Sequence, residues 1–192
     1  MTRKSFGCFD AVASLGAFEH FYSEEQYLGG SQDDIYGTLF ASVADLPPDG
    51  ARFYVQTMVF GKNMIAPDRV DVDAPRDSDA FHLALMRRRQ FPGSWLPFGA
   101  EQVVRSAEPR FRLVSSVSGR LDYIETIRQW RQRFAAPSLR KTLVKARLVP
   151  RWLTSADFRL AFTSGVSANS VCFERELLDH HRMVFEKVSV GA

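Results

Sequence analysis

Residues 9–21 read FDAVASLGAFEHF, and this stretch decides the fold. Its first part, Phe9 to Leu15, is a run of apolar and small residues that ends at Gly16. Such a run without alternation is typical of a strand that is buried on both faces of a parallel α/β sheet. Glu19 and His20 follow directly, and ligands of open α/β sheets bind beyond the carboxyl ends of the strands. The stretch therefore predicts a buried strand with a candidate site at its end.

The chain after this stretch continues as a βαβ unit. Apolar positions in 35–43 have helical spacing, and Asp33-Asp34 can cap that helix. The turn LPPDG at 46–50 ends the helix, and RFYVQTM at 52–58 reads as a second strand. Strands joined in this way are parallel and adjacent. Only eight residues precede Phe9, so we expect the N-terminal strands of the sheet to be missing from this chain.

The remaining chain interleaves helices with two late strands. Helices are predicted at 80–89, 100–108, 122–134, 139–152 with an interruption at Pro150, and 155–164, and strands at 110–117 and 182–188. Residues 182–188 alternate polar with apolar side chains, which favours a terminal edge strand. The predicted fold class is α/β, with about four strands, the last pair antiparallel, and inserted helices.

The composition fits one globular domain over residues 1–192, of which 45% are apolar. No run is long enough to span a membrane, and the basic start lacks the apolar part of a signal peptide, which predicts a cytoplasmic protein. Cys8 and Cys172 are expected to be reduced, and His180-His181 has no partner at metal-ligand spacing, so no metal is predicted. A net charge of +3 is too small to indicate nucleic-acid binding.

Positive charge is concentrated in the segment 120–151. Against only Asp122 and Glu125, this segment holds Arg128, Arg131, Arg133, Arg140, Lys141, Lys145 and Arg147. Two interpretations remain open. The segment is a solvated helical face, or it is a basic surface that meets the anionic head groups of a membrane.

The order of the motifs carries a family resemblance. They are FDAVASLGAFEHF, the Pro-Pro-Asp-Gly turn, the strand end Gln56-Thr57-Met58, FPG and LP within 91–97, SAEPRF at 106–111, DY at 122–123 with Trp130, FER at 173–175, and MVF at 183–185. Together they resemble the cyclopropane fatty acid synthase family, class I S-adenosylmethionine (SAM)-dependent methyltransferases that act on lipid acyl chains. The resemblance spans nearly the whole chain. It implies the C-terminal part of a Rossmann-like sheet, with a lipid-facing helical insertion around 120–165.

The resemblance also implies a bicarbonate site beside the substrate double bond, where the ion removes a proton after methyl transfer. Glu19 corresponds to the family's glutamate ligand and Tyr123 to its tyrosine. Gln56 stands at the position of a histidine, and Met58 at that of an isoleucine whose backbone is a ligand. The family's upstream cysteine has no counterpart, since Cys8 lies too close to the strand. Glutamine cannot take up a proton, which counts against cyclopropane closure more than against methyl transfer. Cyclopropane formation and a methyl-branching or otherwise altered lipid reaction both stay open.

The cofactor site implied by the resemblance is incomplete. Class I methyltransferases hold SAM on a Gly-rich turn, and this chain contains no GxGxG sequence. By resemblance, Leu15, Gly16 and His20 line only one edge of the cofactor. From the residue pattern alone, Glu19 and His20 also fit a simple cap of the next segment, and Tyr123 fits a core residue.

Two hypotheses about function follow. In the first, the chain belongs to a SAM-dependent methyltransferase that modifies unsaturated acyl chains of lipids. It is either a fragment of that enzyme or one part of a split enzyme whose N-terminal half is encoded separately, and it would lie peripherally at an anionic membrane. In the second, it is a non-catalytic remnant or a lipid-binding module. Both predict that the chain is inactive alone, because the Gly-rich turn is absent.

Overall fold

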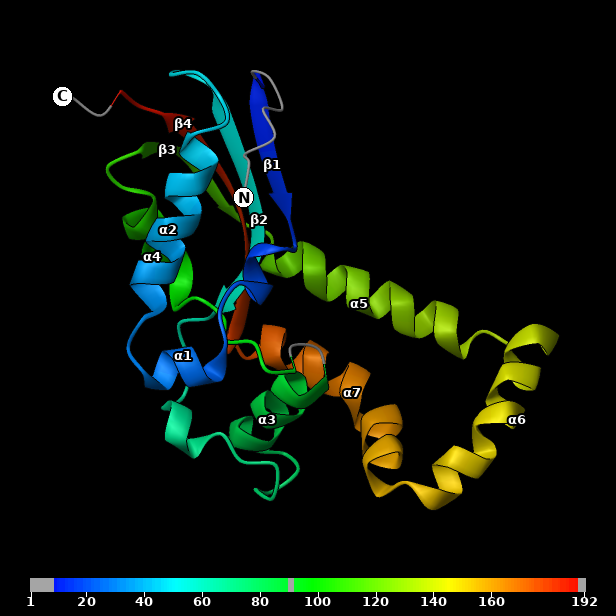
Figure 1. The fold of residues 1–192 in the computed structure, drawn as a ribbon. Coiled ribbons are helices and arrows are strands. Elements are labelled where there is room, and N and C mark those ends of the chain that lie inside the picture. Colours follow the sequence, from blue (N-terminus) through cyan, green and yellow to red (C-terminus); the bar gives the residue numbers. More distant parts are fainter. Residues whose placement is uncertain (1–8, 90–91, 190–192) are drawn as a thin grey trace, which may run out of the picture. The chain divides into compact units, whose positions relative to one another are not determined.

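A computed structural model describes residues 9–89 and 92–189, which form two compact units (Figure 1). Unit 1 comprises Met1–Lys62, Gly93–Gly119 and Asp179–Ala192, and unit 2 comprises Asn63–Pro92 and Arg120–Leu178. The elements of unit 1 are β1 (Ala11–Leu15), the 3-10 helix η1 (Phe18–His20), α1 (Glu24–Leu28), α2 (Gln32–Ala44), β2 (Arg52–Phe60), α4 (Gly99–Ala107), β3 (Phe111–Ser118) and β4 (Leu178–Lys187), whose first residue belongs to unit 2. Those of unit 2 are η2 (Pro67–Arg69), α3 (Asp79–Arg89), α5 (Arg120–Ala135), α6 (Leu139–Thr154) and α7 (Ala156–Glu174).

The sheet of unit 1 has the order β1-β2-β4-β3. β1 and β2 are parallel, with register from Ala11↔Arg52 to Leu15↔Gln56, and β3 pairs antiparallel with β4. Just before the start of β2, the Lys187 carbonyl accepts a hydrogen bond from the Gly50 N–H and the Lys187 N–H donates one to the Ala51 carbonyl, so β4 runs antiparallel to β2. The α/β class, the parallel first pair and the antiparallel last pair are therefore confirmed.

The position of β4 differs from the sequence prediction. The alternation in 182–188 predicted an edge strand, but β4 lies inside the sheet between β2 and β3. Alternation reports that one face of a strand is exposed, whereas an edge is defined by missing hydrogen-bond neighbours in the plane of the sheet. The second property has no local sequence signal here.

The core of unit 1 lies between the sheet and the helices α2 and α4, which cover one face of it (Figure 1). Phe40 of α2 is fully buried, and its ring contacts the rings of Phe53, Phe111 and Phe185 at centroid distances of 5.6 to 5.9 Å. These partners come from β2, β3 and β4. One aromatic side chain thus holds α2 against three strands.

β1 lies at an edge of the described sheet, where only β2 pairs with it. Its residues alternate between exposed and half-buried, and Leu15 is 64% exposed. The prediction of a strand buried on both faces was wrong for this chain, because Ala11, Ala13 and Leu15 are exposed on one face and the residues between them are only half-buried on the other. Among residues 9–89 and 92–189, the other edge of β1 has no strand partner.

Unit 2 is helical, with α3, α5 and α6 all packed on α7. The Ser78 hydroxyl caps the start of α3, since it accepts a hydrogen bond from the Phe81 N–H. Two predictions need correction. Pro150 lies inside α6 without interrupting it, and α7 extends ten residues beyond the predicted end at Ser164, to Glu174.

α2 begins after Ser31, and Asp33 and Asp34 lie in its first turn rather than at the cap. Cys172 is buried with a free thiol whose pKa is raised by burial, and Cys8 lies outside the described residues. Among the described helices, none is both long and apolar enough to cross a membrane.

Candidate active site

A glycine turn at the end of β1 places Glu19. Gly16 has a φ of +64°, a left-handed conformation that glycine adopts at little cost, and its N–H donates to the Gln56 carbonyl at 2.9 Å. The chain then forms η1, anchored by Phe18, whose fully buried ring stacks on Tyr36 at 4.7 Å. Glu19 follows this anchor and therefore points into the protein rather than into solvent.

The Glu19 carboxyl is buried, with only 6% of the residue exposed. Its Oε1 atom accepts a hydrogen bond of 2.6 Å from the N–H of Met58, which lies near the C-terminal end of β2. Burial raises the pKa of Glu19 to about 7, although the hydrogen bond from Met58 opposes the rise. Near neutral pH this carboxyl can therefore exist in both protonation states, as a general acid or base requires.

Replacing Gly16 by alanine should destabilise unit 1 by about 1–2 kcal/mol, because a Cβ in the left-handed conformation meets the neighbouring carbonyl. The added Cβ would lie 3.8 Å from Glu19 Oε2, an ordinary contact, so backbone strain dominates. Gly37 in α2 is the matched control, since nothing lies within 4 Å of its Cβ position. Gly37→Ala should stabilise by up to about 1 kcal/mol. Urea unfolding of both variants tests the prediction, which fails if they shift the midpoint in the same direction.

Gln56 and Met58 lie on β2 beside the Gly16 turn. The Gln56 amide oxygen accepts a hydrogen bond of 3.2 Å from the Tyr54 hydroxyl, which leaves the amide NH₂ group as its donor toward a ligand. The Met58 N–H holds Glu19, and its carbonyl accepts from the Thr57 hydroxyl at 3.0 Å. In the structure, the backbone of Met58 thus serves to orient Glu19.

The residues assigned to the cofactor edge are exposed. Leu15 and His20 face solvent on either side of the Gly16 turn, and His20 Nδ1 lies 3.4 Å from the hydroxyl of Ser94. Ser94 belongs to the loop before α4 and was not singled out from the sequence. Its contact crosses 74 positions of chain, a separation that no local pattern reveals.

Tyr123 belongs to unit 2, whereas Glu19, Gln56 and Met58 belong to unit 1. It lies in the first turn of α5 and is half-buried. Its ring packs at 4.8 Å on Phe173 of α7 and edge-on to Trp130 at 6.3 Å. The Tyr123 ring therefore helps to join α5 to α7.

His181 forms a polar network across β3 and β4. Its Nε2 lies 3.2 Å from Asp179 Oδ2, and its Nδ1 lies 3.1 Å from the Ser116 hydroxyl. Ser118 donates to the other oxygen of Asp179 at 2.7 Å. Partial burial acts to raise the pKa of Asp179, but hydrogen bonds from His181 and Ser118 outweigh it and lower that pKa. Within the described ranges, no group of three or more His, Cys, Asp or Glu is arranged to hold a metal.

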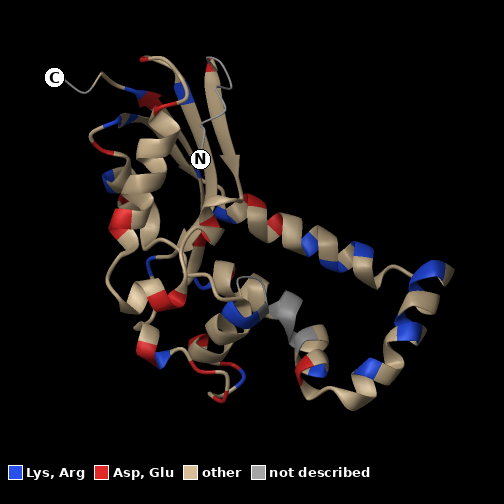
Figure 2. Cartoon of the chain, in the orientation of Figure 1, with Lys and Arg blue, Asp and Glu red and all other residues tan. Residues whose placement is uncertain are grey.

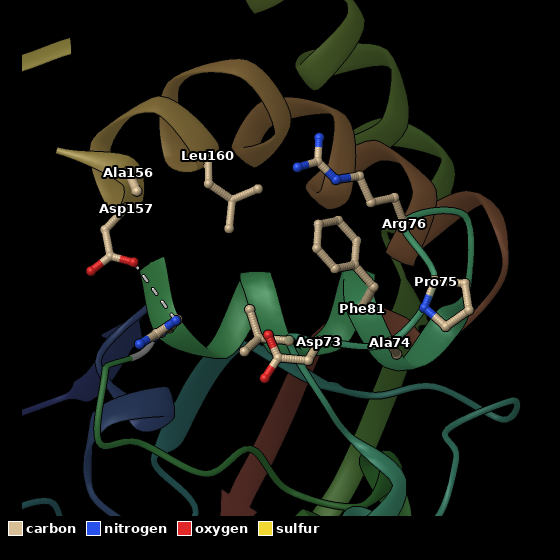
Figure 3. Close-up of a pocket in the computed structure, with 10 residues that line it drawn as sticks. Asp73, Ala74, Pro75, Arg76, Phe81, Ala156, Asp157 and Leu160 are labelled. Carbon is tan, nitrogen blue, oxygen red and sulfur yellow. Dashed lines mark ion pairs between the residues drawn. The ribbon is translucent and has the colours of Figure 1, made fainter. Parts of the chain in front are cut away.

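Unit 2 contains a pocket of about 480 Å³ between α3, the loop before it and the start of α7 (Figure 3). Phe81 and Leu160 point into it from α3 and α7. Both acidic and basic side chains line the pocket, and Arg88 Nη1 lies 3.8 Å from Asp157 Oδ1. None of the site residues predicted from the sequence lines this pocket.

Comparison with known protein families shows the family of this chain. The profile of a family described as mycolic acid cyclopropane synthetase matches residues 4–160. The chain belongs to the mycolic acid cyclopropane synthetase family. That span contains the Gly16 turn, Glu19, both β2 positions and Tyr123, so the family resemblance seen in the sequence is confirmed. Among curated proteins, no match to the chain was found.

Solved structures share the fold of this synthetase-family chain. The cyclopropane synthase MmaA2 from Mycobacterium tuberculosis matches with a TM-score of 0.65 at 19% identity, over 94% of this chain and 56% of its own. The mycolic acid cyclopropane synthase CmaA1, complexed with SAH and CTAB, matches with a TM-score of 0.61 at 18% identity over the same shares. Phosphoethanolamine N-methyltransferase 2 from Haemonchus contortus, in complex with S-adenosylhomocysteine, matches with a TM-score of 0.56 at 12% identity, over 94% and 34%. The chain thus has a methyltransferase fold and spans about half the length of the synthases that it matches.

Proposed function

We propose that this chain forms the acceptor side of a SAM-dependent methyltransferase that modifies unsaturated fatty acyl chains of lipids. The observation that carries the proposal is the buried Glu19 carboxyl at the carboxyl end of β1, with a pKa raised to about 7. Membership of the synthetase family supports methyl transfer and a lipid substrate. The complexes of related folds with SAH and SAM support the choice of methyl donor.

Glu19 suits a site for a small anion such as bicarbonate. A carboxyl with a pKa of about 7 is protonated in about half of the molecules at neutral pH, and only the protonated form donates a hydrogen bond to an anion. Met58 holds Oε1, while Oε2 lies on the Gly16 side. When bound there, bicarbonate would supply the base for the proton lost after methyl transfer.

Gln56 favours methyl branching over ring closure. Its amide donates hydrogen bonds but takes up no proton, so it can orient an anion without serving as a base. Tyr123 would supply a hydroxyl to the same anion. This assignment of Tyr123 rests on the family correspondence alone.

The cofactor requires residues beyond those of this chain. When bound, SAM supplies an electrophilic methyl group, and Leu15, Gly16 and His20 would line one edge of it. We propose that a polypeptide segment with a Gly-rich turn pairs along the open edge of β1. The support is that this edge has no strand partner among residues 9–89 and 92–189.

The experiment combines the chain with a polypeptide that carries Gly-rich strand–turn–helix units of this family. SAM binding by calorimetry and transfer of a labelled methyl group to detergent-dispersed unsaturated phospholipid should appear only with both parts. In the combined protein, Glu19→Gln should lower the transfer rate by about 100-fold, because glutamine can still donate a hydrogen bond to the anion but cannot take over the proton that bicarbonate removes. Glu25→Gln, an exposed acid in α1, should not change the rate. Absence of SAM binding in the combination would reject the proposal.

A lipid-binding module without catalysis is the second candidate. It is favoured by the missing GxGxG sequence and by the exposed apolar residues of α6. Lipid binding without SAM binding, even in the combined protein, would select it.

A further inference from the structure

An apolar stripe runs along α6 on the side away from α7. Its members recur at alternating steps of four and three residues, so they share one face of the helix, and they are Leu139, Leu143, Ala146, Pro150 and Leu153. All five are exposed, with the three leucines at 87%, 66% and 63%. Single exposed leucines are ordinary, but a continuous stripe over four turns indicates a surface that meets another apolar phase.

The opposite face of α6 is already occupied by contacts within unit 2. Leu148, Val149 and Trp152 face Phe158 and Phe162 of α7 around a small apolar pocket. Arg159 lies over the Trp152 ring at 6.0 Å. Packing against α7 therefore accounts for one apolar face of α6 and leaves the stripe unexplained.

The charge on α6 has a single sign. Figure 2 shows Lys and Arg along the helix without Asp or Glu, and the residues are Arg140, Lys141, Lys145, Arg147 and Arg151. Lys141 is used to cap the end of α5, and Lys145 lies over the Phe134 ring at 4.6 Å. Arg140 and Arg147 are exposed and, from their helical positions, border one side of the stripe.

We propose that α6 docks on an anionic lipid surface, with the stripe inserted at the boundary of head groups and acyl chains and with Arg140 and Arg147 on the phosphates. A Leu-rich face beside a purely basic one is the pattern of helices that lie in the membrane interface, and arginine binds phosphate through two parallel hydrogen bonds. The inference rests on the proposed function for the choice of lipid over an acidic protein. Docking would bring the enzyme to its acyl substrate.

The test is co-sedimentation of the full chain with phosphatidylcholine vesicles, with and without phosphatidylglycerol, at low and at physiological salt. Binding should require phosphatidylglycerol and weaken with salt. Arg140→Gln with Arg147→Gln should weaken it by about fivefold for each arginine. The double variant Arg69→Gln and Arg76→Gln, at exposed positions outside α6 with the same loss of charge, should bind like the wild type.

The stripe is tested by Leu143→Gln and Leu153→Gln, which keep the charge and the helix propensity. Each should weaken vesicle binding by about tenfold. Leucine variants that bind like the wild type would overturn the proposal and indicate a purely electrostatic contact, as with an acidic protein. Absence of vesicle binding, or equal binding without phosphatidylglycerol, would also overturn it. The assay contains no SAM, so its failure is separate from failure of methyl transfer to detergent-dispersed lipid.

Discussion

The wild-type chain should become less stable as the pH rises from about 4.5 to about 7, and Glu19→Gln should abolish this pH dependence. The pKa of Glu19 is about 7 in the folded chain and 4.5 ordinarily. In this window the unfolded chain releases the proton while the folded chain keeps it, so the free energy of unfolding falls as pH rises. The total fall amounts to about 3 kcal/mol and levels off above pH 7. Glutamine keeps the acceptor for Met58 N–H and has nothing to titrate.

The measurement is urea unfolding across this pH range in a Trp130→Phe, Trp152→Phe background. Trp95 then remains as the reporter, and it is buried in unit 1, whereas the other two tryptophans lie in unit 2. Glu25→Gln serves as the control, because Glu25 is exposed in α1 and its replacement should leave the wild-type pH dependence intact. A Glu19→Gln curve parallel to that of the wild type would contradict the raised pKa.

Phe40→Ala should lower the stability of unit 1 by about 3–5 kcal/mol, comparable with the whole stability of a small domain. The Phe40 ring is fully buried and contacts the ring of Phe18, the residue directly before Glu19. It also contacts three rings that belong to three different strands, those of Phe53, Phe111 and Phe185. Its loss removes apolar contacts and leaves a cavity that rigid strands cannot close. We expect a large drop in the urea midpoint of the Trp95 signal.

Phe9→Ala is the matched control for this change, because Phe9 loses the same atoms from a position that is 39% exposed. Its cost should be below about 1 kcal/mol. Equal shifts in the two variants would show that Phe40 does not hold α2 on the sheet.

The elements were predictable from sequence because their signals are local, and the family was predictable from the order of such motifs along the chain. The Pro-Pro-Asp-Gly turn, the spacing in α2 and the apolar run before Gly16 each lie within about a dozen residues. Helix ends were predicted less accurately. The sequence predicts an interruption at Pro150, but α6 is exposed and continues through it, since solvent can bind the carbonyl that loses its partner.

The sequence by itself determined the four strands, the longer helices apart from the second half of α7, the parallel pairing of the first two strands and the family to which the chain belongs. Tertiary structure decided the rest. It placed β4 inside the sheet, brought Met58 N–H across 39 positions to Glu19, raised the pKa of that carboxyl by burial, and left one stripe of α6 uncovered. Each of these depends on which distant segments surround a residue, and hydrogen bonding and burial of that kind leave no periodic trace in the chain.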